Sequence, residues 1–285
     1  MNSSKLHKSS NILLVVIGTS IQELNYAKKL LLYPEQAAKL FLRCGKKNTE
    51  KSKQTLTNAL NRNPNTELVL FLAAPSGDSA IAQALELSRT AKTHNMFSFV
   101  VAENMDGCAA AYTSKSQIEK IRSYTESLLF IPSVQFKEKH FLNRLRKKEM
   151  QAKNFYKNAN RFLDFVNKLD RKCGIATLGD MQYILQDSGV SFWAVGKVKG
   201  ENRAQRAAHR CIDSIPRNVL ISSKKIMNQL TISTGIDLDE VETACRTVEM
   251  NLHPDTGIVF GITFLDITEK GRFRVDLLVS GADLE

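Results

Sequence analysis

The sequence lacks the patterns of membrane, secreted and zinc-binding proteins. No apolar run approaches the roughly 20 residues that span a bilayer, and the polar opening MNSSKLHKSSN has neither an apolar signal core nor a cleavage site. The five cysteines form no CxxC pair and have no histidine nearby at ligand spacing, which argues against a zinc site and a disulfide framework. We therefore expect a cytoplasmic protein with buried, reduced thiols and no bound metal.

What the sequence does contain is an alternation of strands and helices. Apolar runs predict buried strands at 11–18, 68–74, 96–102 and 128–132, and helical patterns follow the first three. Strands that alternate with helices favour a doubly wound, Rossmann-like α/β domain with a parallel sheet.

The second half of the chain has a different pattern. Residues 135–172 contain neither Pro nor Gly and predict one long helix. Beyond it we expect an α+β domain with helices near 178–189, 200–215 and 238–252, strands near 190–198 and 228–234, and two strands at 257–266 and 272–281 that pair with each other. The predicted parts are therefore a nucleotide-binding-like domain at 1–134, a central helix at 135–172 and a C-terminal domain at 173–285.

One segment of the second half carries a specific motif. VGKVKGENRAQRAAHRCIDS, at 195–214, resembles the FtsZ segment GxGxxxGExRAxxAAxxAIxS, and the order of elements from 128 to 281 is similar to that of FtsZ, the bacterial relative of tubulin. The resemblance implies an FtsZ/tubulin-like fold with a GTP-binding N-terminal domain, a long central helix and a C-terminal domain that meets the next subunit of a filament. Members normally hydrolyse GTP at that junction.

The glycine-rich loops that the family uses for phosphate are degenerate in this chain. APSGDSAIA stands where the family has GGGTGTG, so only Gly77 remains and Asp78 puts a carboxylate where an anion would lie. Gly18 ends the first predicted strand, but bulky residues follow it. A self-capped turn without nucleotide is the simpler interpretation, because Asp or Ser commonly caps a helix.

Some of the family's functional positions still match. If nucleotide contact is retained, the resemblance implies that it involves Gly18, Asn25, Gly77, Ser79 and Asn154. Of the family's catalytic NxDxxD loop only Asp180 is kept, and Asp180 also suits a helix start. We therefore expect no cofactor and no effective GTPase activity, although GTP or GDP stays open as a ligand.

Basic residues form two candidate surfaces. One is the dense cluster Arg146, Lys147 and Lys148 in the central helix, and the other is a helical face with Arg203, Arg206 and Arg210. A net charge of +11 favours an acidic partner such as nucleic acid or anionic lipid, while a solvated surface is the simpler alternative. The chain stops where FtsZ continues into a tail, so we expect no adaptor-binding tail.

Three functions remain open at this point. The preferred hypothesis is an FtsZ-like protein that acts by protein contact, either by joining or regulating an FtsZ-type filament or by assembling with itself. The alternatives are an active, divergent GTP-hydrolysing filament protein, and a basic module that binds nucleic acid or lipid. Another type of enzyme is disfavoured, because no His lies near a Ser or Cys in a nucleophile motif.

Overall fold

The structure is a computed structural model in which the chain divides into two compact units. It describes residues 11–18, 20–32, 38–43, 49–74, 78–104, 108–132, 144–170, 174–233, 235–264 and 271–280. The N-terminal unit comprises 1–102 with 135–160, and the C-terminal unit comprises 103–134 with 161–285. The boundaries predicted at 134 and 172 stay predictions.

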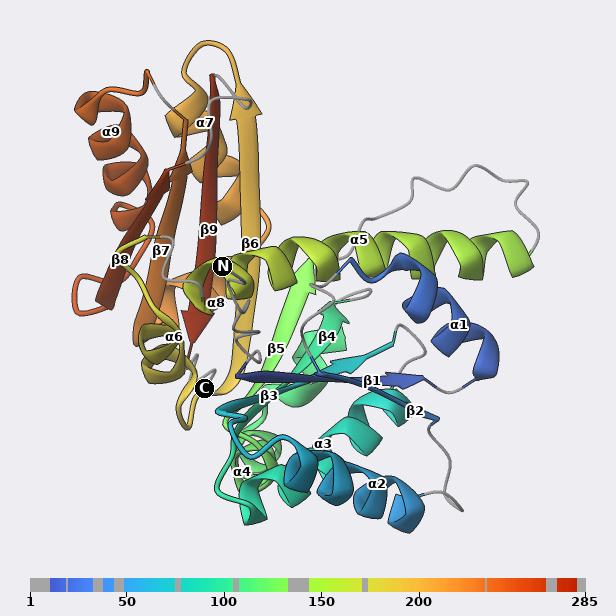
Figure 1. The fold of residues 1–285 in the computed structure, drawn as a ribbon. Coiled ribbons are helices and arrows are strands. Elements are labelled where there is room, and N and C mark those ends of the chain that lie inside the picture. Colours follow the sequence, from blue (N-terminus) through green and yellow to red (C-terminus); the bar gives the residue numbers. More distant parts are fainter. Residues whose placement is uncertain are drawn as a thin grey trace, which may run out of the picture. The chain divides into compact units, whose positions relative to one another are not determined.

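The N-terminal unit is built on parallel strands in the order β2-β1-β3-β4. Every residue of β1 and β3 is buried, as expected for the central strands of a sheet covered on both faces. Figure 1 shows α2 and α3 below this sheet and α1 above it. The elements are β1 (Ile12–Gly18), α1 (Ile21–Leu30), β2 (Ala38–Arg43), α2 (Thr49–Arg62), β3 (Leu68–Ala73), α3 (Asp78–Thr93), β4 (Phe97–Asn104) and the first part of α5 (Arg144–Asp170).

The C-terminal unit contains a mixed sheet in the order β5-β6-β9-β7-β8. Strands β5 and β6 are parallel, as are β7 and β8, whereas β9 runs antiparallel to both β6 and β7. The elements are the short helix η2 (Cys108–Tyr112), α4 (Lys115–Tyr124), β5 (Ser127–Pro132), the rest of α5, α6 (Leu178–Leu185), β6 (Gly189–Lys199), α7 (Arg203–Ile212), α8 (Arg217–Ser222), β7 (Lys225–Ile232), α9 (Leu238–Glu249), β8 (Gly257–Phe264) and β9 (Arg272–Ser280).

Helices cover both faces of the strands in the C-terminal unit. Helix α7 packs on β6 and β9, and it comes so close that a Cβ atom at Gly196 would overlap the carbonyl oxygen of Ala207. On the opposite face, Trp193 of β6 packs edge-on against Phe162 of α5 at 5.4 Å between ring centroids, with Phe165 at 6.4 Å. These aromatic contacts hold the C-terminal part of α5 on the sheet.

The predicted fold class is confirmed, but one detail of the sheet was wrong. The strands expected at 257–266 and 272–281 do not pair with each other, because β7 lies between β8 and β9. The long helix is present at Arg144–Asp170, while the predicted start at 135 lies outside the described residues. Strand β2 and helix α2 were not predicted: the strand is short, with the sequence AKLFLR, and the helix is rich in polar residues.

Candidate functional site

The turn between β1 and α1 is closed by contacts within the chain. Ser20 caps α1: its hydroxyl accepts a hydrogen bond from the backbone N–H of Glu23 at 3.1 Å, and the Glu23 carboxylate accepts one from the N–H of Ser20 at 3.3 Å. This capping box satisfies two of the donors that a helix offers to an anion and adds a negative charge there. A phosphate group at this helix end would meet the Glu23 carboxylate.

Gly18, at the end of β1, packs against the same helix. A Cβ atom there would lie 3.1 Å from Cδ2 of Leu24 and 3.3 Å from Cβ of Glu23. Close packing of α1 on the strand therefore accounts for a glycine at this position, whether or not a ligand approaches it.

The other predicted nucleotide positions fall in the same unit. Asn25 is exposed on α1, Ser79 is exposed in the first turn of α3, and Asn154 is partly exposed on α5, whereas Gly77 lies outside the described residues. Nucleotide contact at these four residues stays a prediction.

Tyr156 of α5 is a neighbour of the capped turn that the sequence did not reveal. Its side chain is buried, and its hydroxyl has no hydrogen-bond partner among the described residues. Burial raises the pKa of this hydroxyl well above its usual value, and the negative charge of Glu23 raises it further. The phenol of Tyr156 therefore stays neutral, and the charge of Glu23 acts on it.

Asp180, the retained residue of the catalytic motif, belongs to a second capping box. Its carboxylate accepts hydrogen bonds from the backbone N–H and the hydroxyl of Thr177, both at 2.8 Å, and its own N–H donates to the Thr177 hydroxyl at 3.4 Å. The carboxylate is therefore bonded to the start of α6. A catalytic role for Asp180 stays a prediction.

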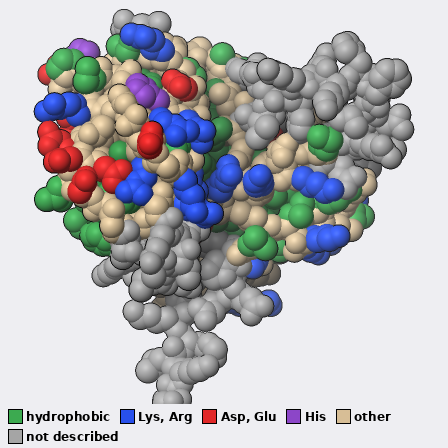
Figure 2. All heavy atoms as spheres, turned by 90° about the horizontal axis from the view of Figure 1, so that it is seen from above, with side chains coloured by type: hydrophobic (Ala, Val, Ile, Leu, Met, Phe, Trp, Pro, Cys, Tyr) green, Lys and Arg blue, Asp and Glu red, His purple; other side chains and the backbone are tan. Residues whose placement is uncertain are grey.

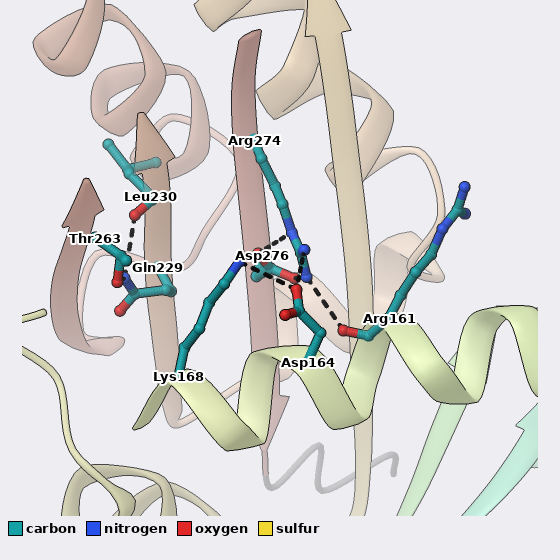
Figure 3. Close-up of polar contacts among 8 residues, drawn as sticks. All are labelled: Arg161, Asp164, Lys168, Gln229, Leu230, Thr263, Arg274 and Asp276. Atoms are coloured by element: carbon teal, nitrogen blue, oxygen red, sulfur yellow. Dashed lines mark hydrogen bonds and ion pairs between the residues drawn. The ribbon is translucent and has the colours of Figure 1, made fainter. Parts of the chain in front are cut away.

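A buried polar network, absent from the predicted site, connects α5 to β9 (Figure 3). The guanidinium of Arg274 donates to Asp276 at 2.7 and 2.8 Å, to Asp164 at 2.7 Å and to the carbonyl oxygen of Arg161 at 3.2 Å. Lys168 makes a further ion pair with Asp164 at 3.1 Å. Arg274 and Asp276 are almost fully buried, so these bonds offset the free-energy cost of removing two charges from water.

The two carboxyl groups of the network have opposite pKa shifts. Burial raises the pKa of Asp276 above its usual value, although Arg274 opposes the shift. Burial also acts on Asp164, but Lys168 and Arg274 outweigh it and lower the pKa of that carboxyl. Asp164 is therefore the firmly ionised partner that completes the bonding of Arg274.

Arg203, Arg206 and Arg210 do not have equivalent surroundings. Arg203 donates two hydrogen bonds to Glu240 of α9, at 2.7 and 2.6 Å, and its side chain is only 17% exposed. Arg206 and Arg210 are exposed and donate to the carbonyl oxygens of Glu201 and Lys197. A basic interaction surface on α7 stays a prediction, with Arg203 mainly linking α7 to α9.

The basic cluster in the central helix is only partly described. Nothing is described of the side chains of Arg146, Lys147 and Lys148. Farther along α5, Lys153, Lys157 and Arg161 are exposed at intervals of four residues, and Figure 2 shows Lys and Arg side chains grouped along the course of this helix.

Charge is divided unevenly between the two units. Residues 1–102 and 135–160 carry 21 Lys and Arg against eight Asp and Glu, a formal charge of +13. The remaining residues carry 19 against 21, a charge of −2, which together gives the +11 of the chain. The positive charge that favours an acidic partner therefore belongs to the N-terminal unit.

The described part of the chain contains neither a candidate membrane span nor a candidate metal cluster. None of the helices there combines the length and apolar character needed to cross a membrane. No group of three or more His, Cys, Asp or Glu side chains among those residues is arranged to hold a metal ion. Of the five cysteines, the two described as free are Cys211, which is buried, and Cys245, which is half-buried.

Comparison with known proteins gives a consistent result. Residues 189–283 match the model of the FtsZ family, C-terminal domain. The cell division protein FtsZ of Magnetospirillum gryphiswaldense is 22% identical over 81% of this chain and 42% of its own length. The chain is therefore similar in sequence to FtsZ, and the family model matches 189–283 of its 285 residues.

Solved structures support the same fold for this FtsZ-like chain. An empty FtsZ dimer from M. jannaschii matches with a TM-score of 0.67 at 16% identity, over 94% of this chain and 88% of that one. CetZ1 from Haloferax volcanii, a GDP-bound monomer, matches with a TM-score of 0.63 at 10% identity, over 94% of each chain. The FtsZ-like chain spans about half the length of the curated relatives it matches.

Proposed function

We propose that this FtsZ-like protein acts by assembling through protein contacts, without effective GTP hydrolysis. Its partner is an FtsZ-type protein or a second copy of itself. The retained C-terminal domain supports contact with another subunit, since that is the part matched by the family model.

The main support for a loss of GTP hydrolysis is the position of the Glu23 carboxylate at the start of α1. This carboxylate stands at the carboxyl end of β1, where an α/β sheet usually binds its ligand, and it uses the helix end that would attract phosphate. The bonding of Asp180 to Thr177 adds to this argument, because phosphoryl transfer depends on carboxylates that are placed to orient water.

Two measurements on the full chain test the proposal. Sedimentation or light scattering, alone and with an FtsZ from the same cell, should reveal self-assembly or a change in FtsZ assembly. Calorimetry and phosphate release should detect neither tight GTP binding nor turnover. Sub-micromolar GTP binding with turnover would contradict the loss of hydrolysis, and the absence of both self-assembly and any effect on FtsZ would contradict assembly.

An active, divergent GTP-binding filament protein is the second candidate. The observation that favours it is the structural similarity to CetZ1, which was solved with GDP. Gly18, Asn25, Ser79 and Asn154 are the described residues that would contribute. Replacing Asn25 and Asn154 with Ala should then abolish GTP binding, whereas under the first proposal there is no tight binding to lose.

A further inference from the structure

The exposed face of α1 combines positive charge with apolar side chains. Ile21, Asn25 and Lys28 follow one another at helical spacing and so share a face, with Lys29 beside them. Ile21 is 60% exposed at the start of the helix and Leu32 is 81% exposed just beyond its end. Two basic residues therefore lie between two exposed aliphatic side chains on a unit that carries a charge of +13.

This face is held firmly in place. The capping box of Ser20 and Glu23 fixes the start of α1. At the other end, the Asn160 side chain of α5 accepts a hydrogen bond from the N–H of Leu32 at 2.9 Å and donates one to the carbonyl oxygen of Leu30 at 2.8 Å. Because both ends are fixed, Leu32 is exposed as part of an ordered surface.

Among the described residues of this face, little opposes a negatively charged partner. The acidic residue of α1, Glu23, is half-buried and bonded to Ser20. Lys28 lies over the ring of Phe41, with its ammonium nitrogen 5.5 Å from the ring centroid, so its stem rests on the protein and its charge stays at the surface.

We infer that this face of α1, formed by Ile21, Lys28, Lys29 and Leu32, docks on an anionic lipid surface. Basic side chains are attracted to the negative potential of such a membrane, and aliphatic side chains gain by entering the boundary between headgroups and acyl chains. A nucleic-acid backbone would engage the lysines but leave Ile21 and Leu32 in water. The inference goes beyond the proposed assembly function and does not depend on it.

Flotation of the full chain with vesicles tests the inference. The protein should bind vesicles of phosphatidylcholine and phosphatidylglycerol, should not bind phosphatidylcholine alone, and should be released as salt is raised. The double variant K28Q/K29Q should weaken binding about 30-fold, because each Lys near an anionic surface contributes about 1 kcal/mol. The matched control K115Q/K120Q removes two exposed lysines from α4 of the other unit and should bind like the wild type.

A second variant separates lipid from nucleic acid. I21S/L32S changes only exposed side chains, so circular dichroism should report an intact fold, and its vesicle binding should also fall. If I21S/L32S binds vesicles as the wild type does, while K28Q/K29Q loses both vesicles and DNA of random sequence, the face is a general polyanion contact and the inference is wrong. It is equally wrong if neutral and anionic vesicles bind alike, if neither binds, or if K28Q/K29Q matches K115Q/K120Q.

Discussion

Arg274 and Asp276 lie two residues apart on β9 and form a bidentate ion pair in the interior of the C-terminal unit. Residues at i and i+2 of a strand share a face, so the planar guanidinium can lie along the carboxylate, with bonds of 2.7 and 2.8 Å. The remaining nitrogen donors reach Asp164 and the carbonyl oxygen of Arg161 (Figure 3). One side chain therefore fastens the C-terminal part of α5 to the sheet.

Removing Arg274 should destabilise the C-terminal unit strongly. Arg274→Met leaves the Asp276 carboxylate buried without its cation, and breaking a buried pair in this way costs about 3–5 kcal/mol. Urea unfolding followed by the fluorescence of Trp193, the single tryptophan, measures the change in this unit. The matched control is Arg246→Met, which breaks an exposed pair with Glu242 and should cost about 0–1 kcal/mol.

Replacing both partners separates the cost of an unpaired charge from that of lost packing. R274M/D276L should recover part of the stability lost in Arg274→Met, because no buried charge remains. Equal unfolding midpoints for Arg274→Met and Arg246→Met would contradict the buried pair.

Acid should act through Asp164 in the same network. The pKa of this carboxyl is lower in the folded chain than its ordinary value of 3.8, so its stabilising contribution is present above that value and is lost as pH falls through the lower, folded pKa. Asp276 acts oppositely, since its raised pKa gives a contribution that is present below 3.8 and lost as pH rises through the folded pKa.

Asp164→Asn should consequently lower stability at neutral pH and converge with the wild type in acid. Urea midpoints measured by Trp193 fluorescence, from neutral pH down to about pH 3, give the difference at each step. Asp239→Asn, a change at an exposed residue of α9, is the control and should follow the wild-type profile. A difference between Asp164→Asn and wild type that stays constant over this range would exclude the ionised carboxylate as its source.

Local patterns were predictable from the sequence, and contacts between distant segments were not. The continuous apolar runs of β1 and β3 predict buried strands. The spacing of Thr177 and Asp180 is that of a capping box at the start of a helix. The alternation of Arg274 and Asp276 with apolar residues looks like a half-exposed strand, and only the tertiary placement of Asp164 explains why both are buried. The pairing of β8 with β7 rather than with β9 likewise depends on contacts between distant segments, which the local sequence does not specify.

Asn160 should control how firmly α1 is held within the N-terminal unit. Asn160→Ala leaves the N–H of Leu32 and the carbonyl oxygen of Leu30 without their partner. Because the first bond is exposed to water and the second is only part-buried, the cost should be about 0.5–1.5 kcal/mol. Hydrogen exchange at the Leu32 amide should accelerate by a corresponding factor. The control is Asn58→Ala, which removes an exposed amide that is bonded to Gln54 on α2. It should leave the exchange rate of the Leu32 amide unchanged.

Tyr156 offers a test of the environment beside the capped β1–α1 turn. Its hydroxyl is buried with no partner among the described residues and near the charge of Glu23, so the hydroxyl carries a desolvation cost that no hydrogen bond offsets. Tyr156→Phe keeps the ring and its contact with Phe155, at 5.1 Å between centroids, and should therefore be neutral or stabilise the chain by up to about 1 kcal/mol.

Tyr156→Ala deletes the ring and should cost about 3–5 kcal/mol. Urea unfolding followed by far-UV circular dichroism compares the two variants. If Tyr156→Phe lost more than about 1 kcal/mol, the hydroxyl would have to be hydrogen-bonded in the folded protein.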